Sequence, residues 1–203
     1  MARAQKIGSW LASDREPELT AAGLRVLDAA SELFYARGIR AVGVDLVAER
    51  AGTTKKTLYA VFGSKDALVA VYLHRRSLRW RRFVLDWLEA RASEPGEARV
   101  LAVFDALEDW HRGSSRGCAF VNAHAEIDAE THPATAVIRA DKEWMADLFV
   151  SLCGEADVVR ADESARALHL LFEGALVLRT VGDRPVAIAD AREVAARLLG
   201  AAG

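Results

Sequence analysis

Hydrophobic residues recur along this chain at the three- and four-residue spacing of an α-helix, and no segment keeps the two-residue alternation of a strand. The first well-marked helix follows Thr20, whose side chain can accept a backbone hydrogen bond at a helix start. Its apolar stripe passes through Leu24, Leu27 and Phe34, and Gly38 ends it. The pattern therefore predicts a helix between Thr20 and Gly38.

Turn residues divide the next stretch into two short helices. The segment "VDLVAERAG" ends at Gly52, and "KKTLYAVF" lies between Thr54 as its cap and Gly63 as its stop. Two short helices joined by a three- or four-residue turn that contains glycine form a helix-turn-helix. Ser64 then begins a long helix that the pattern extends to about residue 91.

The second short helix has two faces of different chemistry. Leu58 and Phe62 are four residues apart and are expected to point inward, which leaves a polar outward face: Lys55, Lys56, Thr57 and Tyr59. In a helix-turn-helix the second helix enters the major groove of DNA, and a helix N-terminus attracts phosphate. Ammonium and hydroxyl groups donate to phosphate oxygens or base edges. The outward face is therefore predicted to read DNA.

The formal charge is unevenly distributed. Residues 1–82 hold 15 lysines and arginines against 8 acidic residues, whereas residues 83–203 hold 12 against 21. A basic first part favours a nucleic-acid partner there and a different task for the rest. The sequence has no apolar run of membrane-spanning length and no secretory signal, and its two cysteines lack metal-like spacing. We therefore expect a cytoplasmic protein.

Helices also fill the second half of the sequence. The segment "SEPGE" at residues 93–97 is the clearest break. The helices expected after it cover residues 98–112, 117–128, 133–153, 162–181 and 188–199. The predicted fold class is all-α, with an N-terminal helix-turn-helix domain followed by a larger helical domain.

Residues 38–68, "GIRAVGVDLVAERAGTTKKTLYAVFGSKDAL", with the preceding "AASELFYARG", resemble the TetR family of bacterial transcriptional regulators. The positions that match the family pattern most closely are Ala48, Ala51, Gly52, Thr57, Leu58, Tyr59, Phe62, Ser64, Lys65, Asp66 and Leu68. Four positions depart from the pattern, and at one of them Thr54 replaces serine conservatively. Gly43 stands in place of a capping serine or threonine, Lys56 replaces a common glycine, and Val61 replaces a common histidine.

The resemblance implies roles for residues near the recognition helix. The residues expected near base edges or neighbouring phosphates are Thr54, Lys55, Lys56, Thr57 and Ala60. Tyr59 and Lys65 are expected to clamp phosphates. The implied organisation is a flexible N-terminal arm (1–18), a helix-turn-helix DNA-binding domain (19–66) and an effector-binding and dimerisation domain (67–203). The arginine-rich run at residues 75–83 is interpreted as the solvent-exposed face of its helix and not as a second nucleic-acid patch.

The resemblance also implies partners for the larger domain. A homodimer is expected through residues 162–181 and 188–199, since both segments carry broad apolar faces. The implied protein is a repressor, not an enzyme, that a small, mostly apolar effector releases from operator DNA, with no cofactor and no metal. The candidate effector-binding residues are Phe104, Trp110, Phe120, Asn122, His124, Trp144, Leu148 and Phe172.

Other chemistries stay open at this point. The alternative class is a small-molecule binding protein or hydrolase with a purely structural helix-turn-helix. Residues 113–117 match Gly-x-Ser-x-Gly, but a nucleophilic Ser115 would need a preceding strand that the pattern does not predict. His124 and Asp128, four residues apart, could contribute to a metal site together with the nearby His132. Cys118 or Cys153 could sense oxidants if a basic partner lay nearby.

Overall fold

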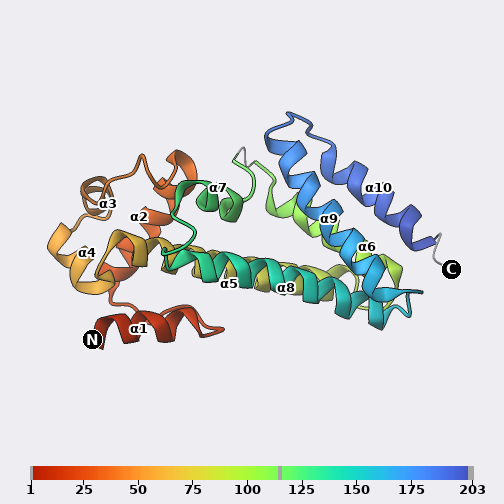
Figure 1. Cartoon of the computed structure of the whole chain (residues 1–203), viewed down its shortest axis with the longest axis horizontal. Helices are drawn as coiled ribbons and strands as arrows, with labels where there is room; N and C mark the ends of the chain where they lie inside the picture. The colour runs from red at the N-terminus through yellow and green to blue at the C-terminus, as the bar shows by residue number, and fades with distance from the viewer. Residues whose placement is uncertain (1, 114–115, 201–203) are drawn as a thin grey trace. The chain divides into compact units, whose positions relative to one another are not determined.

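The computed structural model of the chain describes residues 2–113 and 116–200 (Figure 1). Those residues form ten helices and no strand, which confirms the predicted all-α class, and the helix over Ala2–Leu11 was not predicted. The helices are α1 (Ala2–Leu11), α2 (Ala21–Arg37), α3 (Val44–Arg50), α4 (Lys55–Phe62), α5 (Lys65–Arg91), α6 (Glu97–Trp110), α7 (Ala119–Glu126), α8 (Ala134–Glu155), α9 (Ala161–Thr180) and α10 (Ala187–Gly200). None of the described helices has the length and apolar composition needed to cross a membrane.

The chain packs into two compact units. Unit 1 consists of the residues up to Arg79 together with Ala119–Ala140, and unit 2 consists of Trp80–Cys118 together with the residues from Asp141 onward. The boundary falls inside the long helices α5 and α8. These units are defined by contacts between residues and not by function. The predicted boundary between a DNA-binding domain (19–66) and an effector-binding and dimerisation domain (67–203) therefore stays a prediction.

Local sequence signals set the helix ends in unit 1. Thr20 caps α2, because its Oγ1 accepts a hydrogen bond from the backbone N–H of Gly23 at 3.2 Å. Gly63 ends α4 with a φ of +82°, which a residue without a side chain adopts at low cost. The helices α2, α3 and α4 pack against one another. Leu24, expected in the buried stripe of α2, is 40% exposed, because the buried face is centred on Leu27 and Phe34.

The N-terminal residues form a helix where the sequence suggested a flexible arm. In α1, Ile7 and Trp10 are 8% and 9% exposed, so the helix has one buried face. Beyond the helix, Glu16 forms an ion pair with Arg79 at 3.2 Å. Two apolar residues three positions apart are too short a pattern to separate such a helix from a disordered segment.

Aromatic side chains dominate the core of unit 2. The rings of Phe104, Phe149 and Phe172 lie with their centroids 5.9 to 6.2 Å apart, in tilted and edge-on arrangements. These three side chains are almost fully buried and come from α6, α8 and α9. The helix α10 packs against both α6 and α9. A second aromatic group joins Trp110 to Trp80 and Phe83, at centroid distances of 5.5 and 5.1 Å.

Candidate nucleic-acid interface

The beginning of α4 is held by a tight turn and a threonine cap. The backbone N–H of Thr53 donates to the carbonyl of Ala48 at 2.9 Å, and Gly52 adopts a φ of +59° between α3 and α4. The Oγ1 atom of Thr54 then accepts from the backbone N–H of Thr57 at 3.2 Å. A side chain that was predicted to contact DNA therefore also fixes the first turn of the helix.

The two faces of α4 differ as the sequence predicts. Leu58 and Phe62 are fully buried, whereas Lys56 and Ala60 are exposed and Tyr59 is 41% exposed. Val61 is half-buried, and its Cγ1 lies 3.3 Å from the point where a Cβ on Gly23 would be. The valine that departs from the family pattern therefore serves the packing of α4 against α2. Lysine, tyrosine and small side chains remain on the outward face.

The predicted DNA-binding lysines differ in their surroundings. The ammonium group of Lys55 forms an ion pair with Asp45 of α3 at 2.8 Å, and both side chains are mostly exposed. The hydrogen bond to Asp45 raises the pKa of Lys55. Lys56 is exposed, as the predicted DNA-facing surface requires. A phosphate that approaches Lys55 also meets the negative charge of Asp45, which lies 2.8 Å from the same ammonium group and repels the phosphate.

Lys65, the first residue of α5, is half-buried, and its side chain contacts the protein. Its Nζ donates to the backbone carbonyl of Ile39 at 2.6 Å and lies 5.9 Å from the ring centroid of Phe34. Partial burial lowers the pKa of Lys65. The predicted phosphate clamp is therefore already bound to the turn between α2 and α3, and its role at DNA stays a prediction.

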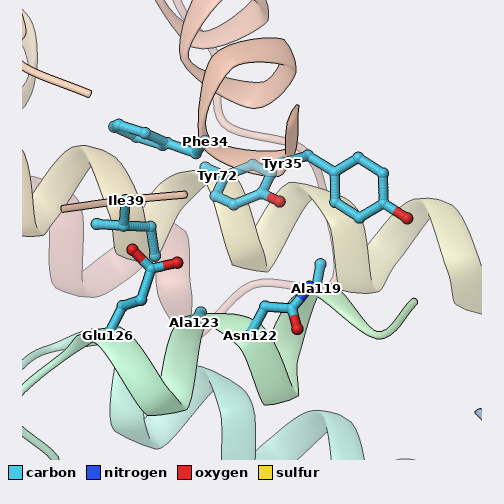
Figure 2. A pocket seen from close by; sticks show the side chains of 8 residues that line it. All are labelled: Phe34, Tyr35, Ile39, Tyr72, Ala119, Asn122, Ala123 and Glu126. Carbon is cyan, nitrogen blue, oxygen red and sulfur yellow. The ribbon is translucent and has the colours of Figure 1, made fainter. Parts of the chain in front are cut away.

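The end of α7 also contacts that turn. The Oε2 atom of Glu126 accepts from the backbone N–H of Arg40 at 2.8 Å, and Arg40 Nε donates to the carbonyl of Glu126 at 2.8 Å. Figure 2 shows the Glu126 side chain extending from α7 toward Ile39. Sequence reasoning missed Glu126, because its partner lies 86 residues earlier and no local pattern connects them.

Three of the candidate effector-binding residues lie in unit 1. Phe120 is buried and His124 is exposed, both on α7. Asn122 lines a cavity of about 10 Å³, roughly the space of one water molecule, beside Tyr72 and Glu126 (Figure 2). A drug-sized ligand needs a few hundred Å³, so this cavity as it stands is too small to hold one, and the effector-binding role of Asn122 stays a prediction.

The other five candidates lie in unit 2 and divide by burial. Phe104 and Phe172 belong to the aromatic core, where they are 0% and 3% exposed. Trp110, Trp144 and Leu148 are half-buried and pack against that core. The structure therefore brings these five residues into one unit, with Phe104 and Phe172 inside its core and the other three packed against that core; their effector-binding role stays a prediction.

Two buried charged groups were missed by sequence reasoning. Arg75, expected to solvate its helix, is 2% exposed and donates to Asp28, Ser31 and the carbonyl of Leu27, at 2.7, 2.6 and 3.0 Å. In unit 2, Lys142 of α8 bonds both carboxylate oxygens of Glu173 of α9, at 2.8 and 3.1 Å. Both are tertiary pairings, and neither follows from helical periodicity.

The alternative chemistries find limited support in the structure. The described residues hold no group of three or more histidine, cysteine or acidic side chains placed for a metal. Cys118 does have a basic neighbour, since Lys142 Nζ lies 3.6 Å from its Sγ, whereas burial raises the pKa of Cys153. Ser115 lies outside the described residues. The Gly-x-Ser-x-Gly segment follows α6, a helix, and not the strand that a nucleophile elbow requires.

The helices α9 and α10 expose an apolar surface within unit 2. A groove of about 230 Å³ runs between them, and its lining residues are Leu170, Leu171, Gly174, Ala175, Leu178, Arg184, Ala187, Asp190, Ala191 and Val194. Leu170 is 76% exposed and Leu178 is 50% exposed. An exposed apolar patch of this kind marks an interaction surface more often than a solvated one.

Together, the glycine turn, the capped α4 and its basic outward face define a helix-turn-helix DNA-binding protein. Comparison with known sequences identifies its family. The sequence model of the family described as "Bacterial regulatory proteins, tetR family" matches residues 26–72. The uncharacterized HTH-type transcriptional regulator Rv1255c of Mycobacterium tuberculosis is 31% identical over 157 residues, which cover 77% of this chain and 74% of that protein.

Solved structures agree with the sequence match. The crystal structure of SCO4454, a TetR-family transcriptional regulator from Streptomyces coelicolor, superposes with a TM-score of 0.79 at 31% identity, covering 90% of this chain and 96% of that one. The HTH-type transcriptional activator FasR of Mycolicibacterium smegmatis is 34% identical over 112 residues, 55% of this chain and 49% of that protein. The chain belongs to the TetR family of DNA-binding transcriptional regulators, a family that is not enzymatic.

Proposed function

We propose that this regulator binds operator DNA as a homodimer formed through α9 and α10, and that a small, mostly apolar effector releases it. The observation that carries the proposal is the uncovered apolar surface on these two helices. Leu170 and Leu178 of α9 and Val194 of α10 are 76%, 50% and 42% exposed, and all three line one groove, which distinguishes them from apolar side chains scattered singly over a surface. Removing such surface from water is the main favourable term in protein association, and it offsets the entropy lost when two subunits join.

The partner that fits this surface is a second copy of the same helix pair. Two copies related by a twofold axis would present identical apolar grooves to each other and form a four-helix bundle. Gly174 lies in the groove, and a Cβ there would have no atom within 4 Å, so the backbone of a neighbouring helix can approach closely. Ala175 lines the same groove but is 3% exposed within its own subunit.

Dimerisation would set the distance between the two recognition helices. A dimer presents two copies of α4, which must lie about one helical turn of B-DNA, roughly 34 Å, apart to enter successive major grooves. The residues proposed to contact DNA are Thr54, Lys55, Lys56, Thr57, Tyr59, Ala60 and Lys65. A change in the spacing of the two helices would weaken both contacts at once.

The effector is proposed to bind unit 2 beside its aromatic core. Trp110, Trp144 and Leu148 are the half-buried members of the candidate set, and a guanidinium from Arg81 lies 5.2 Å from the ring centroid of Trp144. An aromatic and aliphatic lining selects a mostly apolar, ring-containing molecule. Such a ligand shifts the dimer only by its different affinities for the DNA-bound and released states.

Repression is the proposed sign of regulation, because a dimer on promoter DNA blocks transcription by occupancy alone and needs no further surface. The relative FasR is named an activator, so the opposite sign occurs among similar proteins. A reporter driven by the bound promoter decides between them. Repression predicts higher expression when the regulator is removed, and lower expression would establish activation.

Sedimentation velocity tests the proposed dimer with two matched glycine variants. Gly174 of α9 and Gly154 of α8 are both exposed helical glycines with open space around a new Cβ. Gly174→Arg is expected to sediment as a monomer, because its long side chain would fill the groove into which the partner's helix has to pack. Gly154→Arg is expected to remain dimeric. A dimeric Gly174→Arg protein would place the interface elsewhere.

A further inference from the structure

One peptide group in the turn between α2 and α3 is held on both sides by charged side chains. Lys65 Nζ donates to the carbonyl of Ile39 at 2.6 Å, and the N–H of Arg40 donates to the Glu126 carboxylate at 2.8 Å. This carbonyl and this N–H belong to the same planar unit and point in opposite directions. A cation and an anion therefore hold the Ile39–Arg40 peptide from its two edges, an arrangement here named the peptide clamp.

The backbone next to the peptide clamp is shaped for the close approach of Glu126. Gly38 has a φ of +91°, and a Cβ on it would lie 2.9 Å from Glu126 Oε1. A side chain at this position would be strained and would also displace the carboxylate. The second hydrogen bond, from Arg40 Nε to the carbonyl of Glu126, ties the end of α7 to the same turn.

The peptide clamp matters because α3 has a weak start of its own. Its N-cap residue, Gly43, makes no side-chain cap hydrogen bond. The position of α3 therefore depends on the preceding turn, in which Ile39 and Val42 are buried. Hydrogen bonds to charged groups are shorter and roughly twice as strong as neutral ones, so the clamp adds a strong polar restraint to this turn, although water reaches the Glu126–Arg40 bond.

We propose that Glu126 is a positioning residue for DNA binding, which acts from outside the helix-turn-helix sequence by holding the turn into α3. Glu126 belongs to the segment Ala119–Ala140, which the chain enters directly after Cys118 of unit 2. A ligand that displaces α7 would pull on this peptide and disturb the helix-turn-helix. This inference deepens the proposed function. Only the DNA-affinity experiment rests on the proposed function, and the hydrogen-exchange experiment does not.

The same geometry assigns Lys65 to positioning. An ammonium group has three donors, so Lys65 can hold Ile39 and still reach a phosphate. The two roles differ in salt dependence. Losing a phosphate contact lowers the slope of log affinity against log salt by about 0.9, whereas losing a positioning contact weakens binding without changing the slope.

Amide hydrogen exchange tests the clamp without DNA. In Glu126→Ala, exchange at the Arg40 amide and through α3 should be at least tenfold faster than in the wild type, while α9 is unchanged. Glu126→Gln retains an acceptor oxygen, so its exchange rate at the Arg40 amide should lie between those of the wild type and Glu126→Ala. Glu130→Ala, at an exposed glutamate four residues along the segment, is the control and should match the wild type. Unchanged exchange at Arg40 in Glu126→Ala would refute the clamp.

DNA affinity tests the consequence, with a duplex that the wild-type protein selects from a random-sequence pool. Glu126→Ala should bind it about tenfold more weakly with the same salt slope, and its melting temperature should stay close to that of the wild type. A loss of affinity that follows a general loss of stability would overturn the positioning role. If the wild type selects no duplex, the proposed function fails. The exchange experiment still tests whether Glu126 holds the Arg40 amide.

Discussion

The buried ion pair between Lys142 and Glu173 makes a quantitative prediction for unit 2. Both side chains are about three-quarters buried, at 27% and 26% exposed, and their contact distance is 2.8 Å. Removing one partner of a buried pair typically costs about 3–5 kcal/mol, because the other charge stays buried without compensation. Partial exposure lets water reach these two groups, so about 2 kcal/mol is expected for Glu173→Gln.

The pH dependence of this loss follows from two pKa shifts. Burial alone would raise the pKa of Glu173, but the neighbouring His169 and Lys142 outweigh burial and lower it. Glu173 therefore stabilises the fold above its unfolded pKa of about 4.5, and the effect disappears as the pH falls through the lower folded value. Burial opposes the charge of Lys142, but Cys118, Glu173 and Asp141 together raise its pKa. Its contribution is therefore complete below about 10.5 and disappears as the pH rises through the higher folded value.

Urea unfolding followed by tryptophan fluorescence measures the effect in the right unit, because Trp80, Trp87, Trp110 and Trp144 all lie in unit 2. A loss of about 2 kcal/mol corresponds to a melting temperature lower by roughly 4–8 °C in a protein of this size. The stability difference between wild type and Glu173→Gln should be constant near neutral pH and shrink at both extremes. The control Glu163→Gln removes an exposed pair with Arg160 and should change stability by less than about 0.5 kcal/mol. A Glu173→Gln protein as stable as this control would refute the reasoning.

Three further predictions concern DNA and effector binding. Lys56→Ala should weaken operator binding and lower the salt slope by about 0.9, measured by fluorescence anisotropy, and an unchanged slope would remove Lys56 from the phosphate contacts. Asp45→Asn frees Lys55 and removes a negative charge beside the DNA, so it should tighten binding several-fold, and weaker binding would show that the ion pair orients Lys55 productively. An effector is first identified by screening a library of apolar ring compounds. Trp144→Ala should then raise the effector concentration needed to release the protein from its operator, and the affinity for the operator without effector should not change. Early melting with no ligand-specific effect would assign Trp144 to the core.

The parts of the fold that could be predicted are those whose signals are local. Thr20 and Thr54 do cap α2 and α4, and glycines end both helices, because capping and positive φ depend on a few neighbouring residues. The helix-turn-helix follows from such signals, and the family match confirms it. The inward and outward faces of α4 follow from periodicity alone.

The parts that could not be predicted depend on residues far apart in the sequence. Arg75 looks like one more solvated arginine in a basic run, and only the fold places it against Asp28, 47 residues away. The same applies to Glu126 and Arg40, 86 residues apart. Aromatic and lone polar residues on apolar helices suggested one effector pocket; the structure places Asn122 in unit 1 and Trp144 in unit 2, and their shared role stays a prediction. Periodicity shows which side of a helix is apolar and not which neighbour covers it.

Hydroxyl-radical footprinting of the selected duplex tests the central claim most directly, namely that a dimer presents two α4 helices to successive major grooves. The account predicts two protected patches about 10 base pairs apart, and an insertion of about 5 base pairs between them should abolish binding, because it rotates one half-site to the far side of the duplex. A single protected patch, or full affinity after the insertion, would contradict the account.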